Sequence, residues 1–99
     1  MPQAIYNERE LVKVYAEQIA SVAKREQAGE NVQHELEEII ANAVADFGRT
    51  AGVNQAEAIQ ALGERLDDMS TTATPIAKEV FGTAKKIALH KRQDLGDSK

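Results

Sequence analysis

VQHELEEIIANAVADF, residues 32–47, is the most apolar and most regular stretch of this sequence. Its apolar side chains recur at intervals of three and four residues, which places them on one face of an α-helix. They are Val32, Leu36, Ile39, Ile40, Ala43, Val44 and Phe47. Three acids, Glu35, Glu37 and Glu38, lie off this stripe and are expected to face water. The stretch therefore predicts the most deeply buried helix of an all-α domain.

Three other amphipathic stretches surround this one, and no alternating β pattern competes with them. The sequence predicts a compact four-helix arrangement with helices over about 8–28, 32–47, 55–69 and 75–95. Three of the four helices begin with a capping signal. These signals are Asn7 with Glu10, Asn54 with Glu57, and Thr74 with Pro75. The stop signals are glycines, at positions 29, 48 and 96.

The length of 99 residues fits a single helical domain, 1–99, with a short N-terminal lead over 1–6 and a tail over 96–99. Links this short predict that consecutive helices run antiparallel or nearly so. One alternative stays open at Gly29. Because glycine costs a helix interior only about 1 kcal/mol relative to alanine, the first two helices could form one long helix. Gly63 lies beside the apolar stripe of the third helix, where its missing side chain would let another helix approach.

Composition excludes several classes of protein. The chain has no cysteine, which rules out disulfides, zinc–thiolate sites and cysteine nucleophiles. No signal-peptide pattern opens the sequence, and no apolar run approaches the roughly 20 residues that a membrane span needs. These features predict a soluble, cytoplasmic protein that does not bind a membrane.

The formal charge of −4 is distributed unevenly. Residues 1–69 carry a net charge of −7, and residues 70–99 carry +3. An acidic body with a basic last helix indicates charge-based binding to another protein or to a second copy. The candidate protein-binding residues are Glu35, Glu38, Lys85, Lys86, His90, Lys91 and Arg92.

A second hypothesis concerns the corner formed by Val44–Leu62. Its apolar spacing and Gly52 in the turn are compatible with a DNA-binding helix-turn-helix. Asparagine and glutamine side chains can read adenine edges in the major groove. The candidate DNA-binding residues are Arg49, Asn54, Gln55 and Gln60. Nucleic acid is the second choice of partner, because lysines and arginines for phosphate contacts are few in this corner.

Metal and catalytic chemistry have little support in the sequence. Glu30, His34 and Glu38 are four residues apart and would share one helix face. A di-iron bundle needs Glu-x-x-His motifs from two helices, whereas this chain offers a single weak set. We therefore expect no metal, no cofactor, no small-molecule substrate and no enzymatic activity. The favoured hypothesis is a small helical interaction module of regulatory, inhibitor or adaptor type, with self-association as one form of its binding.

Overall fold

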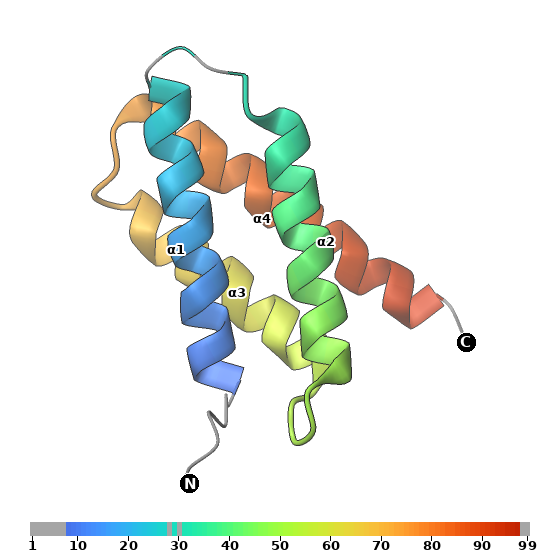
Figure 1. The fold of residues 1–99 in the computed structure, drawn as a ribbon. Coiled ribbons are helices and arrows are strands. Elements are labelled where there is room, and N and C mark those ends of the chain that lie inside the picture. Colours follow the sequence, from blue (N-terminus) through green and yellow to red (C-terminus); the bar gives the residue numbers. More distant parts are fainter. Residues whose placement is uncertain (1–7, 28, 30, 98–99) are drawn as a thin grey trace, which may run out of the picture.

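The computed structural model describes residues 8–27, 29 and 31–97 (Figure 1). These residues form four α-helices and no strand. The helices are α1 Glu8–Gln27, α2 Gln33–Arg49, α3 Gln55–Ser70 and α4 Pro75–Asp97. This confirms the predicted compact all-α arrangement, whose radius of gyration is 13.6 Å. The predicted lead over 1–6 and the Asn7 cap lie outside the described residues.

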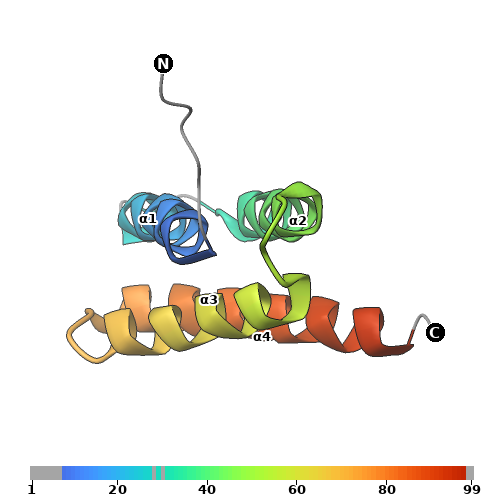
Figure 2. The ribbon, with the colours of Figure 1, turned by 90° about the horizontal axis from the view of Figure 1, so that it is seen from below.

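The four helices form two crossed layers. Figure 2 shows α1 and α2 end-on in one layer and α3 and α4 lengthwise in the other. Within each layer the two helices run antiparallel (Figure 1). The antiparallel prediction is therefore right for α1 with α2 and for α3 with α4. Between α2 and α3 the chain changes layers, and α3 runs back obliquely across α2 (Figure 1).

The link between α1 and α2 is a true break, so the alternative of one long helix is wrong. Gly29 has φ of +99°, a left-handed conformation that glycine adopts without the steric cost of a Cβ atom. Its N–H donates a hydrogen bond to the Glu26 carbonyl at 2.9 Å. Asn31 then accepts a hydrogen bond from the Gln33 N–H through its side-chain oxygen at 3.1 Å. The chain reverses within these few residues, which sets α2 antiparallel to α1.

Helix boundaries differ from the prediction by one or two residues, the usual margin. α2 begins at Gln33 and continues through Gly48 to Arg49. α4 continues through Gly96 to Asp97, so Gly96 does not end it. Two predicted N-caps are confirmed. The Asn54 side-chain oxygen accepts from the Glu57 N–H at 2.9 Å, and the Thr74 hydroxyl oxygen accepts from the Ala77 N–H at 3.3 Å.

The core lies between the two layers. α2 buries one stripe, Leu36, Ile40, Ala43 and Phe47, at 2% exposure or less, with Val32 just before the helix. The facing layer contributes equally large buried side chains from α3, so α2 shares the centre of the core with it. The largest fully buried side chains are Phe47, Ile19, Ile40, Ile59, Leu62, Leu66 and Val32.

Gly63 of α3 is buried against α4, as its place beside the stripe predicted. A Cβ atom at this position would lie 3.6 Å from Lys85 Cγ and 3.8 Å from Leu89 Cδ2. The stem of Lys85 therefore covers the glycine, and α3 and α4 pack closely there. No helix in the described part of the chain is long and apolar enough to cross a membrane.

Candidate functional site

The predicted basic residues of α4 divide between two flanks of that helix. Lys85 and Arg92 lie on the flank that faces α3. The Lys85 ammonium forms an ion pair with Asp67, and Arg92 Nε donates a hydrogen bond to the Ala56 carbonyl at 3.3 Å. Both cations are thus engaged with α3, and they contribute to the packing of the α3–α4 layer.

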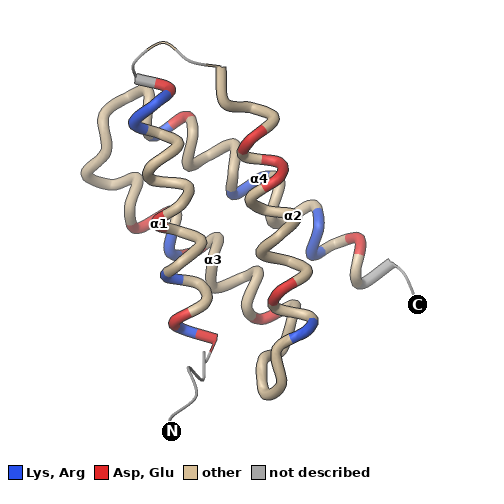
Figure 3. Tube along the Cα trace, viewed as in Figure 1, with Lys and Arg blue, Asp and Glu red and all other residues tan. Residues whose placement is uncertain are grey.

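The other flank of α4 faces α2 and borders a groove of about 470 Å³, which we call the α2–α4 groove. Its lining residues are Glu37, Lys86, Ile87, His90 and Lys91. Ile87 is partly buried and supplies the apolar surface, while Glu37 stands on the α2 wall. Figure 3 shows acidic positions along α2 and basic positions in the second half of α4. Three of the predicted binding residues, Lys86, His90 and Lys91, therefore meet in one place.

The two predicted acids of α2 lie elsewhere. Glu35 forms an ion pair with Arg25 of α1. Glu38 points to the solvent, with His34 Nε2 3.4 Å from its carboxylate. The acid in the groove is Glu37, which sequence reasoning left out of the candidate set. All three acids lie off the apolar stripe, and only the crossing of α2 over α4 shows which one faces the basic helix.

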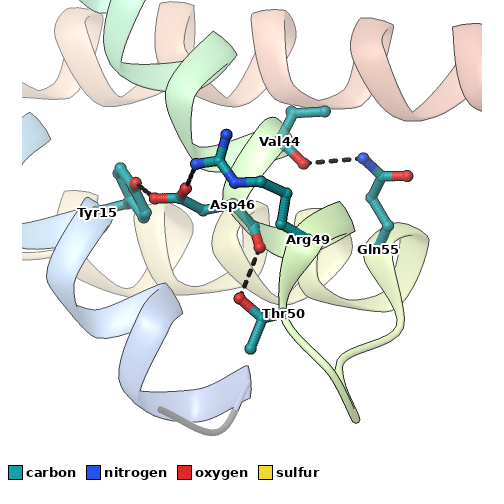
Figure 4. A network of polar contacts seen from close by, with 6 residues as sticks. All are labelled: Tyr15, Val44, Asp46, Arg49, Thr50 and Gln55. Atoms are coloured by element: carbon teal, nitrogen blue, oxygen red, sulfur yellow. Dashed lines mark hydrogen bonds and ion pairs between the residues drawn. The ribbon is translucent and has the colours of Figure 1, made fainter. Parts of the chain in front are cut away.

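The predicted corner for DNA binding uses its amides within its own chain. The Asn54 side-chain oxygen caps α3, as described above. Gln55 Nε2 donates a hydrogen bond to the Val44 carbonyl at 2.8 Å (Figure 4). Gln55 lies directly over Gly48, where a Cβ atom would be 2.7 Å from its amide nitrogen. The Gln55 amide thus ties the start of α3 to the end of α2.

The remaining two candidates of this corner also have acidic neighbours. Arg49 forms an ion pair with Asp46, and Gln60 Nε2 donates to Glu64 at 3.3 Å. A duplex would have to displace these contacts to reach the side chains. DNA binding stays a prediction that the geometry of the corner does not support further.

A polar network joins α1 to the C-terminal end of α2 (Figure 4). The Tyr15 hydroxyl donates to the Asp46 carboxylate, and the Thr50 hydroxyl donates to the Asp46 carbonyl at 2.7 Å. Burial raises the pKa of Tyr15 above its ordinary value of 10.0, and the positive charge of Arg49 opposes part of this rise. The phenol is therefore neutral near pH 7 and acts as a hydrogen-bond donor.

Titratable clusters elsewhere are small. His90 Nε2 lies 3.9 Å from the Asp94 carboxylate, and the side chain of His90 is 74% exposed. Among the described residues no group of three histidines and carboxylates could hold a metal ion. Glu30, which the sequence placed near His34, lies outside the described residues.

Two further surface clefts carry a different balance of charge. Among its described lining residues, the cleft beside the α1–α2 link has the acids Glu26 and Glu79 and no lysine or arginine. The cleft between α1 and α3 mixes both signs, with Arg9, Lys13 and Arg65 among four acids. The α2–α4 groove differs from both because its charges are segregated, with the acid on one helix and the bases on the other. Comparison of the chain with protein-family models, curated proteins and solved structures found no match.

Proposed function

We propose that this protein is a small, non-enzymatic interaction module that binds another protein chain in the α2–α4 groove. The observation that carries the proposal is that two lysines of the groove have no carboxylate partner within the described residues. Within the described residues, no carboxylate forms an ion pair with Lys86 or Lys91, whereas Lys85 is paired with Asp67. Two exposed or half-exposed ammonium groups beside a partly buried isoleucine form a surface that a partner can complete.

The chemistry of the groove indicates the class of partner. Carboxylates would satisfy Lys86 and Lys91, and an aliphatic side chain would cover Ile87. Such groups occur together on an amphipathic helix with an acidic face, whose residues three and four apart stand side by side. Charge complementarity would set the choice of partner and the association rate more than the final affinity.

Two observations support a binding role over catalysis. Among the described residues, no charged or polar side chain is fully buried. Catalytic acids and bases depend on such environments for their shifted pKa values. Tyr15, whose pKa is shifted, donates to a carboxylate of its own chain and lies outside the α2–α4 groove. A regulatory, inhibitor or adaptor role in the cytoplasm fits these features, and the absence of cysteine fits a reducing compartment.

A peptide-display selection tests the proposal. The wild-type protein would be the bait, and the library would encode random helical peptides. We expect enrichment of peptides with acids and an aliphatic residue on one face, and binding that weakens with salt. The double variant Lys86→Glu/Lys91→Glu should lose these peptides. The charge-matched double variant Lys24→Glu/Lys78→Glu, at exposed positions of α1 and α4 outside the groove, should keep them. Equal binding to both variants, or enrichment of basic peptides, would refute the proposal.

A further inference from the structure

We infer that the occupant of the α2–α4 groove is a second copy of this chain, in a two-fold dimer that pairs Glu37 of each protomer with Lys86 of its partner. The inference rests on the proposed function and identifies the chain that would bind in the α2–α4 groove. Its basis is the segregation of charge on this face, with Glu37 on the α2 wall and Lys86, His90 and Lys91 on the α4 wall.

A surface of this kind is self-complementary. In a two-fold dimer the same patch of both protomers meets, and each contact occurs twice. A two-fold axis that runs between the two walls brings the acidic wall of each protomer opposite the basic wall of the other. The overall charge of −4 makes two copies repel at a distance, so the opposite walls must align for the dimer to form.

The shape of the molecule leaves room for a second copy. Figure 1 shows that the C-terminal end of α4 extends past α2, and Figure 2 shows the same end beyond the α1–α2 layer. Arg92 and Leu95 near this end contact the rest of the chain, whereas Gln93 and Asp94 are exposed. His90, which lines the groove, is 74% exposed, so this part of the groove is open to solvent. The α2 helix of a partner protomer brings acids to Lys86 and Lys91, which form no ion pair among the described residues.

Charge reversal gives a test that depends on the contact between protomers. In homodimers of Glu37→Lys, the introduced ammonium group would face Lys86 of the partner protomer. In homodimers of Lys86→Glu, the introduced carboxylate would face Glu37 of the partner protomer. Each variant alone should raise the dissociation constant of the dimer about tenfold or more. When the two variants are mixed, both contacts join opposite charges again. Sedimentation velocity of the mixture should therefore show the dimer restored.

Matched controls separate this contact from a general effect of net charge. Glu17→Lys on α1 and Lys78→Glu on α4 change the net charge by the same amounts at exposed positions outside the groove. Each should leave the dimer close to wild type, alone and mixed. The inference is overturned if wild type sediments as a monomer at the highest soluble concentration. It is also overturned if the groove variants fail to weaken the dimer, or if their mixture fails to restore it. A monomeric wild type that still selects acidic peptides would keep the proposed function, so the two failures are distinguishable.

Discussion

The hydroxyl group of Tyr15 in α1 donates a hydrogen bond to the carboxylate of Asp46 in α2. The ring of Tyr15 also meets Phe47 edge to face, with centroids 6.0 Å apart and an interplanar angle of 82°. Tyr15→Phe removes the hydroxyl and keeps the ring, so it isolates the hydrogen bond. We expect the free energy of unfolding in urea to fall by about 1–2 kcal/mol, because the acceptor is charged.

A double-mutant cycle with Asp46→Ala checks this assignment. The Tyr15→Phe change should cost much less in the Asp46→Ala background, since the acceptor is already gone. Arg49→Ala is the matched control on the same carboxylate. Its side chain is 72% exposed, so its loss should cost at most about 1 kcal/mol. Equal costs of Tyr15→Phe in both backgrounds would show that the hydroxyl acts elsewhere.

The pKa of Tyr15 predicts how stability changes at alkaline pH. Burial raises this pKa above 10.0 in the folded chain, against the opposing charge of Arg49. Below pH 10 both states hold the phenol proton, and the contribution to stability is complete. As pH rises through 10, the unfolded chain loses its proton while the folded chain keeps it, so the free energy of unfolding falls. The loss is complete once pH exceeds the folded pKa.

Two measurements test this pH dependence. The free energy of unfolding of Tyr15→Phe should fall less steeply above pH 10 than that of wild type. In the Tyr6→Phe variant, Tyr15 is the single tyrosine of the chain, and its tyrosinate absorbance should appear above pH 10. A titration midpoint below 10 would mean that Arg49 outweighs burial.

Alanine substitution at three glycines should change the free energy of unfolding in different directions. Gly29 and Gly52 have φ of +99° and +83°, and a Cβ atom at either meets nothing within 4 Å. Alanine there should cost about 1–2 kcal/mol from backbone strain alone. Gly82 is exposed within α4, and a Cβ atom there also meets nothing. Gly82→Ala should raise the free energy of unfolding by about 0.5–1 kcal/mol through helix propensity.

Chemical denaturation of the three variants measures whether each substitution raises or lowers the free energy of unfolding. The space around a Cβ atom is open in every case, so only the backbone conformation distinguishes the sites. Destabilisation by Gly82→Ala would show that α4 has a constraint near this position beyond helix propensity. A neutral Gly29→Ala would show that the link between α1 and α2 can adopt another conformation.

Gly48 and Gln55 form a pair whose substitutions should not be additive. Gln55→Ala loses the hydrogen bond to the Val44 carbonyl and should cost about 0.5–1 kcal/mol. Gly48→Ala would push the Gln55 amide away, since its Cβ atom would lie 2.7 Å from Nε2. In the wild-type background, the loss of the Gln55 hydrogen bond should cancel the gain in helix propensity from Gly48→Ala. In the Gln55→Ala background the same change should stabilise α2 by about 0.5–1 kcal/mol. Identical effects in both backgrounds would contradict the contact.

Local features of this fold were predictable from the sequence because they depend on neighbouring residues. The caps at Asn54 and Thr74 need only a side-chain oxygen and the next turn of the helix. The burial of Leu36, Ile40 and Phe47 follows from their spacing on one face. The position of Gly63 beside a buried stripe already indicated a close helix contact. Each of these predictions requires only that the stretch is helical, and none depends on which other helix packs against it.

The make-up of the groove was not predictable in the same way. Lys85 and Lys86 are adjacent in sequence, yet one faces α3 and the other borders the α2–α4 groove. Likewise Glu35 faces α1 while Glu37 faces α4. A helix turns by about 100° per residue, so the flank of each charge depends on how the two layers cross. The sequence shows which residues are charged. Which of them become neighbours depends on the turn between α2 and α3, because that turn sets how the two layers cross.

The division between Lys85 and Lys86 gives a prediction that joins stability to binding. Lys85→Ala removes the ion pair with Asp67 and the stem that covers Gly63, so unfolding should become easier by about 0.5–1 kcal/mol. Lys86→Ala removes an exposed side chain and should change stability by less than about 0.5 kcal/mol. Both values would be measured by urea denaturation at a concentration where the chain is monomeric. The order should reverse in sedimentation and peptide-binding assays, where Lys86→Ala weakens binding and Lys85→Ala does not. If Lys85→Ala weakens binding as strongly as Lys86→Ala, then the partner covers both flanks of α4, and the contact extends from the α2–α4 groove onto α3.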